Sequence, residues 1–339
     1  MSGSAKSRLA VLNGTCLDVV EEYRGWIVSQ GVELDAQQSY RSLDEAESLR
    51  ITRDADGIIL PASFRSFPHE PHMAACPRLK VCSIAASGYE WLDVDAATKH
   101  GIVVTFAPGR EGAEVVADMA WGLMLAVARQ IPYHHIAMSR GENVRGMGSS
   151  VFGKTLGIVG LGNIGKAVAR RAKGFDARVI ATEPYPDEKF VRENNVALMP
   201  LDQLLTEADF VSLHMRLDEK TRNLIGAREL SRMKPTAILI NTARQELVDE
   251  AALVTAIESS TIGGAGLDDP PASDAAKRLF GRNNVVFTPH LGNRAIEGVR
   301  GVFKSAVENA IAVFRGDPPP FVVNPKVYDK GTRAAGAAR

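Results

Sequence analysis

A short apolar run that ends in a glycine-rich turn constrains the fold of this chain more than any other feature. The apolar residues 155–159 lead into Gly160-Leu-Gly-Asn-Ile-Gly165, and an amphipathic segment follows as far as Lys173. A buried strand, the pattern Gly-x-Gly-x-x-Gly and a helix in this order are typical of a β-α unit that binds a dinucleotide. The motif alone also fits a helix-capping glycine loop in another kind of α/β protein.

Each glycine of the motif has a separate physical reason. Gly160 permits the tight turn, and Gly162 lets the backbone approach a pyrophosphate. Gly165 lets the helix pack closely on the strand. Asn163 and Ile164 begin the helix, whose first N–H groups are free to bind the phosphate charge.

An acidic residue at the end of the next strand strengthens the dinucleotide interpretation. Residues 178–182 form a second apolar strand, and Glu183 follows 18 residues after Gly165. This spacing is close to the roughly 20 residues expected for the carboxylate that binds the adenosine ribose. No arginine or lysine lies between Glu183 and Asp187 to hold a 2′-phosphate. The sequence therefore predicts NAD rather than NADP, with a surface acid at a strand end as the alternative for Glu183.

The composition argues against several classes of protein. The 339 residues suggest about two domains, and 45% of them are hydrophobic. Forty basic residues balance forty acidic ones, so the net charge gives no reason to expect a nucleic-acid or membrane partner. The spacing of Cys16, Cys76 and Cys82 suggests no disulfide framework, and we expect reduced cysteines in a cytoplasmic protein. The N-terminus carries no apolar core of a signal peptide.

Buried strands and helices alternate along the chain. Strands are expected at residues 9–12, 57–60, 80–85, 102–105, 210–214, 237–241, 264–267 and 285–288. Helical segments such as 44–50 and 94–100 lie between them. This alternation predicts an α/β fold with parallel sheets that helices cover on both faces.

The stretch from Val115 to Ala128 is apolar on nearly every side of a helix. It contains Asp118 and is too short to span a bilayer. Such a helix must be covered by protein all round. We expect it to join two domains, to form a subunit contact, or both, and we favour a homodimer.

Side chains that suit acid–base chemistry follow three successive strands. Thr242, Ala243 and Arg244 follow the strand at 237–241, whereas Asp268 and Asp269 follow the strand at 264–267. His290 comes shortly after the strand at 285–288. Since ligands of an open parallel sheet bind beyond the carboxyl ends of its strands, these residues are expected to converge near the nicotinamide.

The chemistry of this set is coherent. Arginine grips a carboxylate with two N–H groups, histidine transfers a proton near neutral pH, and a nearby acid favours the imidazolium. The set suits oxidation of a hydroxyl group next to a carboxylate, or the reverse reduction. The alternatives are a surface ion pair for Arg244 and a hydrogen-bonded core histidine for His290. The spacing of the histidines and acids predicts no metal site.

With these residues the chain resembles the D-isomer-specific 2-hydroxyacid dehydrogenase family over most of residues 80–325. The resemblance rests on four segments in this order: Val159-Gly-Leu-Gly-Asn-Ile-Gly165, Leu239-Ile-Asn-Thr-Ala-Arg244, Gly264-Ala-Gly-Leu-Asp268 and Thr288-Pro-His-Leu-Gly292. It implies two Rossmann-like or flavodoxin-like domains with parallel sheets, the cofactor domain being inserted into a discontinuous catalytic domain. The implied bounds are 1–104 plus 295–325 for the substrate (catalytic) domain and 105–294 for the NAD-binding domain. Residues 326–339, rich in Ala, Gly, Lys and Arg, are expected to form a flexible tail.

The resemblance also implies roles for individual residues. Arg244 would orient the substrate carboxylate and carbonyl, and His290 would be the acid in reduction and the base in oxidation. Asp268 would face the nicotinamide carboxamide. The other residues implied to bind the cofactor are Gly160, Gly162, Asn163, Ile164, Gly165, Glu183, His214, Met215, Thr242 and Ala243.

A loop in the first domain is implied to bind the substrate. The backbone N–H groups of Ala86, Ser87, Gly88 and Tyr89 would receive the carboxylate in the cleft between the domains. A small-residue loop suits this role because little side-chain bulk blocks the backbone. A plain strand-to-helix turn is the alternative. Arg65 is a candidate for a second anionic group of the substrate, with a solvated loop charge as its alternative.

The chain departs from the family where the catalytic histidine is paired. Relatives usually carry a glutamate a few residues after the aspartate that matches Asp268, whereas this chain continues Asp269-Pro-Pro-Ala-Ser273. Asp269 is the nearest acid that could pair with His290, and Asp274 is a second candidate. Gln245 stands where relatives commonly have glycine, and Arg216 where they commonly have proline.

We therefore expect an NAD-dependent D-2-hydroxyacid dehydrogenase that acts on a small (R)-2-hydroxy or 2-oxo acid. The alternative is an NAD(H)-sensing binding protein of the corepressor kind with weak or no turnover, which the missing glutamate leaves open.

Overall fold

The protein consists of two compact units. The computed structural model describes residues 6–12, 16, 19–36, 44–61, 69–89 and 91–329. Unit 1 comprises residues 1–112 and 294–339, and unit 2 comprises residues 113–293. The boundary between residues 112 and 113 falls inside the helix α5 (Arg110–Ala128), which is continuous across it. The sequence led us to expect this boundary at 104/105, before the helix begins. Arg65 and residues 330–339 of the expected tail lie outside the described residues.

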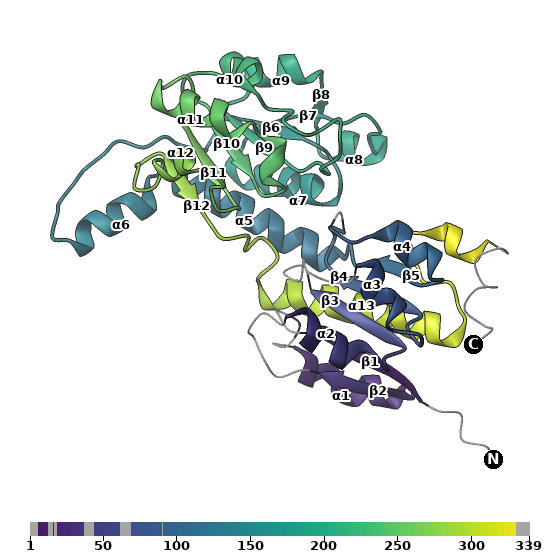
Figure 1. Cartoon of the computed structure of the whole chain (residues 1–339). Coiled ribbons are helices and arrows are strands. Elements are labelled where there is room, and N and C mark those ends of the chain that lie inside the picture. The colour runs from purple at the N-terminus through teal and green to yellow at the C-terminus, as the bar shows by residue number, and fades with distance from the viewer. Residues whose placement is uncertain are drawn as a thin grey trace. The chain divides into compact units, whose positions relative to one another are not determined.

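Unit 1 contains a five-stranded parallel sheet of order β2-β1-β3-β4-β5 (Figure 1). Its strands are β1 (Ser7–Val11), β2 (Val32–Ala36), β3 (Gly57–Pro61), β4 (Val81–Ala85) and β5 (Val103–Phe106). Its helices are α1 (Val20–Ser29), α2 (Glu45–Thr52), α3 (Glu70–Ala74), α4 (Val94–Lys99) and α13 (Ile296–Arg315). Every residue of β3 and β4 is buried, as expected of central strands that are covered on both faces. The sequence analysis missed β2, because this edge strand carries Glu33 and Asp35 instead of an apolar run.

The C-terminal part of the chain returns to unit 1. Phe303 of α13 is fully buried in the core, and Ser83 Oγ of β4 donates a hydrogen bond of 2.7 Å to Ala306 O. A 3₁₀ helix, η4 (Pro325–Tyr328), follows, and its Val327 is only 3% exposed. The expectation of a flexible tail from residue 326 is therefore wrong for residues 326–329. Although Lys326 and Asp329 nearby are charged, the apolar Val327 packs into the hydrophobic core of unit 1.

Unit 2 contains a seven-stranded parallel sheet of order β12-β11-β10-β9-β6-β7-β8. Its strands are β6 (Thr155–Val159), β7 (Arg178–Thr182), β8 (Ala197–Leu198), β9 (Phe210–Leu213), β10 (Ile238–Asn241), β11 (Gly264–Leu267) and β12 (Val285–Phe287). Besides α5, its helices are α6 (Ile131–Ser139), α7 (Asn163–Ala172), η2 (Lys173–Phe175), α8 (Glu188–Glu193), α9 (Leu201–Glu207), α10 (Ala227–Arg232), η3 (Gln245–Leu247), α11 (Glu250–Glu258) and α12 (Asp274–Lys277). The strand order reverses between β6 and β9, and ligands of such sheets bind at this switch point. The predicted fold class, parallel α/β sheets in two Rossmann-like domains, is confirmed.

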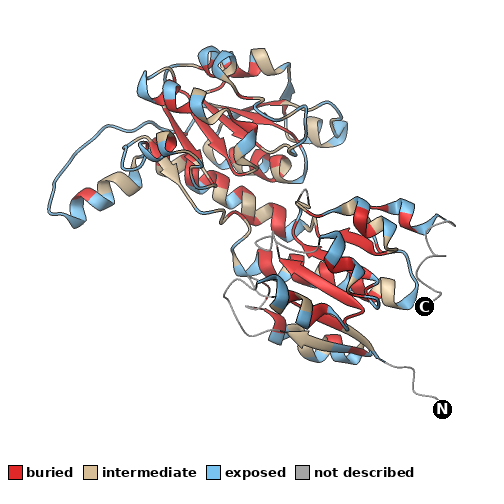
Figure 2. Cartoon of the chain, viewed as in Figure 1, coloured by how far each residue is buried: buried red, intermediate tan, exposed pale blue. Residues whose placement is uncertain are grey.

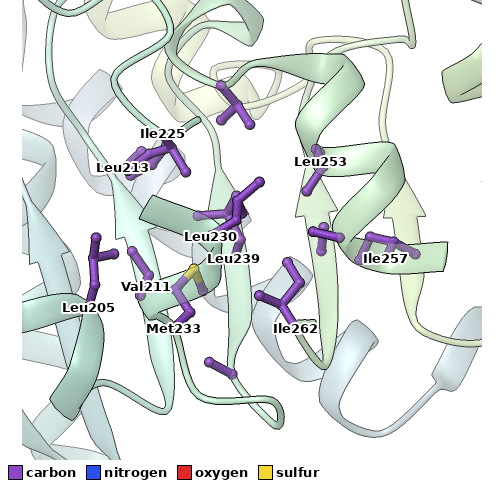
Figure 3. Packing of buried hydrophobic residues seen from close by; sticks show 14 of the residues in the cluster. Leu205, Val211, Leu213, Ile225, Leu230, Met233, Leu239, Leu253, Ile257 and Ile262 are labelled. Carbon is purple, nitrogen blue, oxygen red and sulfur yellow. The ribbon is translucent and has the colours of Figure 1, made fainter. Parts of the chain in front are cut away.

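Apolar layers cover both faces of the seven-stranded sheet, and its central strands are buried (Figure 2). On one face, side chains of β9 and β10 pack against α9, α10 and α11, as Leu205, Leu230 and Leu253 illustrate (Figure 3). On the other face, Trp121 of α5 donates a hydrogen bond of 3.1 Å to Val168 O and stacks on Phe175.

The burial of α5 against unit 2 accounts for most of its apolar surface. Ala117, Ala120, Leu123, Met124 and Val127 belong to the buried cluster on this face of the sheet. Asp118 and Gly122 are exposed. No helix in the described part of the chain is both long enough and apolar enough to cross a membrane.

Candidate functional site

The turn between β6 and α7 has the geometry that the glycine pattern predicts. Gly160 has a φ of +94°, and a Cβ there would lie 2.9 Å from the carbonyl carbon of His214. A Cβ on Gly165 would lie 2.1 Å from Gly160 O, so only glycine lets α7 approach the turn this closely. A Cβ on Gly162 would meet no atom within 4 Å. The turn is therefore tightly packed at its two ends and open at its middle glycine.

The open part of the turn coincides with the N-terminus of α7. Gly162 is the N-cap residue, and no side chain caps the helix. The first N–H groups of a helix have no partner within the helix, and together with the helix dipole they attract an anion. Gly162, Asn163 and Ile164 thus form a backbone surface suited to a pyrophosphate.

Glu183 ties the end of β7 to the glycine turn. Its Oε2 accepts a hydrogen bond of 2.8 Å from Leu161 N, and its Oε1 accepts one of 3.0 Å from Tyr185 N. A carboxylate has about four lone-pair sites, so both oxygens can also accept from ribose hydroxyls. The carboxylate therefore lies at the turn, as a ribose-binding acid must.

Two buried polar atoms beyond the ends of β9 and β10 suit a polar ligand. Among the described residues, His214 Nδ1 and Thr242 Oγ1 have no hydrogen-bond partner. The other ring nitrogen of His214 lies 2.8 Å from Ser212 Oγ, and burial lowers the pKa of His214 to about 3, so its ring is neutral. Met215 and Ala243 are partly buried and pack against the apolar cluster of the sheet. Buried polar atoms without partners are costly, and the polar groups of a dinucleotide would satisfy them. The residues present thus fit NAD.

The strands that precede Arg244, Asp269 and His290 are neighbours in the sheet, since β11 pairs with both β10 and β12. Asn241, at the end of β10, shapes the turn that carries Arg244. Its Nδ2 donates a hydrogen bond of 2.7 Å to Arg244 O, and its Oδ1 accepts one of 3.0 Å from Ala243 N. Arg244 is half-buried, and its Nη1 donates 2.7 Å to Ala243 O.

Asp268 builds the turn that carries His290. The buried Asp268 carboxylate accepts hydrogen bonds from Thr288 Oγ1 (2.6 Å), Leu291 N (2.7 Å) and Gly292 N (2.6 Å). His290 itself has a φ of +55°, a left-handed conformation that is unusual for a residue with a side chain. These three hydrogen bonds hold the turn in which that conformation occurs. The expected contact of Asp268 with the nicotinamide carboxamide remains a prediction.

The ring of His290 contacts the acid that follows Asp268. His290 Nδ1 lies 2.9 Å from Asp269 Oδ1, and the Asp269 side chain is 17% exposed. Asp274, the other candidate acid, is 96% exposed and pairs with Lys277 instead. Of the two candidate acids, Asp269 is therefore the one that contacts the His290 ring.

The loop expected to bind the substrate carboxylate belongs to unit 1 and follows β4. Ala86 is buried, and its carbonyl accepts a hydrogen bond of 2.9 Å from Ala107 N. The ring of Tyr89 packs edge-on against Phe106, with 5.3 Å between the ring centroids. Ser87 is exposed and Gly88 is partly exposed.

The sequence analysis assigned no role to Asn241, Thr288 or Glu250, all of which shape the site. Glu250 accepts hydrogen bonds from Ala272 N and Ser273 N, at 2.8 and 3.0 Å. As the first residue of α11, Glu250 resembles an ordinary acid at a helix N-terminus. Only a polar residue at the end of an apolar strand marked Asn241 in the sequence. Among the described residues, no group of three or more histidines, cysteines and acids is arranged to hold a metal ion.

Comparisons with known proteins agree with this geometry. The family model for the D-isomer specific 2-hydroxyacid dehydrogenase, NAD binding domain, matches residues 121–292. The chain is 38% identical over 312 residues to a glyoxylate reductase of Korarchaeum cryptofilum, covering 88% of this chain and 92% of that one. It is also 38% identical over 304 residues to a D-3-phosphoglycerate dehydrogenase of Synechocystis, covering 88% of this chain and 53% of that one.

Solved structures extend the likeness to the whole fold. The crystal structure of a D-lactate dehydrogenase with NAD+ from Lactobacillus jensenii aligns with a TM-score of 0.76 at 29% identity, covering 93% of this chain and 99% of that one. The matched family model falls wholly within unit 2, which contains the glycine turn, Glu183 and the Asp269–His290 pair. NAD is the cofactor of this unit, and the chain belongs to the D-isomer-specific 2-hydroxyacid dehydrogenase family.

Proposed function

We propose that the protein interconverts a small 2-oxo acid and the corresponding (R)-2-hydroxy acid, with His290 as the acid–base group and Arg244 as the carboxylate anchor. The observation that carries this proposal is the 2.9 Å contact between His290 Nδ1 and Asp269 Oδ1. A carboxylate on one ring nitrogen fixes the tautomer and leaves the other nitrogen for the substrate.

His290 performs the proton transfer in both directions. In reduction, Nε2 of the protonated ring gives its proton to the carbonyl oxygen, which becomes the hydroxyl of the product. In oxidation, the neutral ring takes the same proton back. Asp269 accepts the Nδ1–H throughout and stabilises the positive charge of the protonated ring.

Arg244 binds the part of the substrate that does not react. Its planar, positively charged guanidinium suits a two-point hydrogen bond to a carboxylate. The turn shaped by Asn241 fixes the backbone of Arg244. The small-residue loop of unit 1, from Ala86 to Tyr89, is proposed to offer backbone N–H groups to a substrate carboxylate.

The cofactor residues of unit 2 divide along the dinucleotide. Gly162, Asn163 and Ile164 would hold the pyrophosphate, and Glu183 would hold the adenosine ribose. Thr242 and His214 would offer polar contacts to the dinucleotide beyond the pyrophosphate, toward the nicotinamide. When bound, NAD supplies or accepts the hydride.

The relatives favour a compact substrate. One similar protein is a glyoxylate reductase and another is a D-lactate dehydrogenase. Both names refer to 2-hydroxy or 2-oxo acids with small side chains. We therefore propose glyoxylate and its near homologues as the first substrates to test.

A coupled screen tests the proposal. Purified protein is mixed with NADH and, separately, with glyoxylate, hydroxypyruvate, pyruvate and bulkier 2-oxo acids, and NADH absorbance is followed. We expect turnover with at least one of the small acids. Tight NADH binding without turnover on any of them would favour the sensing protein instead.

We further propose that the enzyme is a cytoplasmic homodimer. Its three cysteines are buried and form no disulfide in the described structure, as in proteins of reducing compartments. The α6 helix of unit 2 leaves Ile131, Ile136 and Met138 exposed, at 55%, 45% and 72%. In Figure 1, α6 and the chain that follows it extend away from the seven-stranded sheet. Apolar side chains in such a projection are suited to burial against a second copy of the chain.

A further inference from the structure

A pocket lies at the carboxyl ends of β10, β11 and β12, beside the acid that contacts His290. Its wall is mostly apolar, and its polar members are Asn241, Gln245, Glu250 and Asp269. Asn241 and Asp269 flank the proposed catalytic residues. Glu250 and Gln245 have no part in the proton transfer or in cofactor binding, so their place in this wall calls for a reason.

The Glu250 carboxylate joins two segments of the site. Its Oε1 accepts hydrogen bonds from Ala272 N at 2.8 Å and from Gln245 Nε2 at 3.1 Å, and its Oε2 accepts one from Ser273 N at 3.0 Å. Gln245 directly follows Arg244, and residues 272 and 273 end the loop that begins at Asp269. One side chain therefore connects the backbone next to the carboxylate anchor with the loop that carries the acid.

The composition of that loop makes this connection effective. Pro270 and Pro271 have fixed φ angles and no N–H groups, so the loop has few internal degrees of freedom and no backbone donor at its centre. The donors that follow, at Ala272 and Ser273, are bound by Glu250. Fixing one end of so stiff a loop fixes the backbone of Asp269 at the other end.

We infer that Glu250 is a positioning residue that keeps Asp269 in hydrogen-bonding reach of His290 and orders the segment of Arg244 through Gln245. This inference rests on the proposed function. Among the described residues Glu250 makes no hydrogen bond to the His290 ring, and it acts through the loop and through Gln245. Gln245 and the shortened Asp269–Ser273 loop, both unusual for the family, are thereby parts of one arrangement.

The test compares three variants in which the change is small. Glu250→Gln keeps the shape of the side chain but replaces one acceptor oxygen by a donor, which cannot accept from the N–H groups of the loop. Asp249→Asn is the matched control, because Asp249 belongs to the same helix, where it accepts a hydrogen bond from Ala252 N, and no hydrogen bond joins it to the loop among the described residues. Asp269→Asn removes the acid itself.

We expect Glu250→Gln to lower kcat for 2-oxo acid reduction by roughly tenfold, about the effect of one hydrogen bond to a charged group. The loss should be larger at pH 8 than at pH 6, because the protonated ring of His290 depends on Asp269. NADH affinity should stay within about twofold of wild type, since Glu250 is not among the cofactor residues. Asp249→Asn should keep the wild-type pH profile and nearly the wild-type melting temperature, because asparagine caps a helix N-terminus about as well as aspartate does.

A double-mutant cycle separates positioning from a general loss of stability. If Glu250 acts through Asp269, Glu250→Gln should have little further effect on the pH profile in the Asp269→Asn background. A Glu250→Gln variant that loses melting temperature but keeps the wild-type pH profile would overturn the inference. So would equal and additive effects of the two substitutions on the pH profile.

A second readout keeps this test independent of turnover. ¹⁵N NMR of the ring nitrogens reports the protonated fraction of His290 in the full chain without any substrate. We expect that fraction at neutral pH to fall in Glu250→Gln and to stay unchanged in Asp249→Asn. If wild-type protein turns over no 2-oxo acid, the proposed function fails, and this measurement still decides whether Glu250 positions Asp269.

Discussion

At the scale of single residues, two adjacent acids contact different parts of the His290 region. Asp268 uses both oxygens to bind the 288–292 turn, and Asp269 uses Oδ1 to contact the ring. Because the backbone of His290 is left-handed, the turn needs this fixed support to present the ring. The pairing of acid and histidine therefore depends on backbone geometry as much as on side-chain chemistry.

Replacing His290 by alanine should abolish most of the proton transfer. We expect turnover to fall about 10²- to 10⁴-fold, while the dissociation constant for NADH changes by less than about twofold. Steady-state kinetics and a fluorescence titration of NADH measure the two quantities. His290→Asn is the backbone control, because asparagine adopts positive φ more readily than alanine does. Equal losses of turnover and NADH affinity would contradict the assigned role.

Replacing Glu183 by alanine should weaken the preference for NAD over NADP. The variant loses the acceptor for the ribose hydroxyls and the bond to Leu161 N, so we expect kcat/KM with NADH to fall roughly tenfold. The value with NADPH should change less, because the carboxylate repels a 2′-phosphate. Glu188→Ala, an exposed acid on α8, is the matched control. An unchanged NADH-to-NADPH ratio would remove Glu183 from the ribose site.

At the scale of elements, the β6–α7 unit combines a structural contact and a binding surface within six residues. Gly165 is pressed against the turn, whereas Gly162 faces open space. The end of β9 lies against the same turn, because the backbone at His214 closes on Gly160. Substitutions in this unit can therefore separate folding from cofactor binding.

Gly162→Ala and Gly165→Ala should differ in what they change: the first should lower NAD affinity, and the second should lower the free energy of unfolding. A methyl group at Gly165 would collide with Gly160 O, so we expect a loss of about 1–3 kcal/mol in the free energy of unfolding. A methyl group at Gly162 meets no protein atom, so stability should stay within about 0.5 kcal/mol while NAD affinity falls. Thermal unfolding and NAD titration of both variants measure this. Normal NAD binding by Gly162→Ala would show that the pyrophosphate lies elsewhere.

The buried ring of His214 should make the stability of unit 2 depend on pH. Its pKa is lowered by burial from 6.5 to about 3, so between these values the unfolded chain binds a proton that the folded chain does not. The free energy of unfolding therefore keeps its full value with respect to His214 above pH 6.5. As the pH falls from 6.5 toward 3, this titration lowers the free energy of unfolding by about 1.4 kcal/mol per pH unit.

His214→Gln removes this titration and keeps a polar group near Ser212. Urea unfolding of both proteins between pH 4.5 and 7.5 should show a smaller decline for the variant below pH 6.5. His72 of unit 1, whose pKa burial lowers to about 4, acts in the same direction in both proteins and cancels in the comparison. Parallel declines would show that His214 becomes charged without cost in the folded protein.

At the scale of the whole molecule, several of the large exposed hydrophobic side chains lie on one projection of unit 2, which α6 and the segment after it form. Met138 on α6 and Met147 in the segment after it are 72% and 93% exposed. Every residue from 138 to 150 is exposed in the described structure. A helix whose apolar residues face several directions needs a covering partner, and the proposed homodimer provides one.

The double substitution Met138→Glu with Met147→Glu should prevent this association. We expect wild-type protein to elute as a dimer at micromolar concentration, and the variant as a monomer, because two charges per chain would have to be buried at the contact. Light scattering coupled to size-exclusion chromatography measures the mass. Leu198→Glu, an exposed residue on the edge strand β8, should leave the dimer intact. A monomeric wild type at all concentrations would refute the proposal.

The sequence by itself determined the elements with strong local patterns. Central strands such as β3, β4, β6 and β10 are apolar runs, and the β6–α7 turn requires glycine at fixed places, so neither depends on distant residues for its prediction. The chain order of Arg244, Asp269 and His290 after successive strands also predicted that they share one edge of a parallel sheet.

Only the tertiary structure decided which partners meet. It selected Asp269 over Asp274 for His290, and it brought Glu250 to a loop more than twenty residues away in the chain. In the tertiary structure β2 also forms the edge of the five-stranded sheet, and Val327 is buried in the core of unit 1. The physical reason is the same in each case: a hydrogen bond or an apolar contact between distant segments depends on how turns and strands are placed in space, and no local periodicity in the sequence encodes that placement.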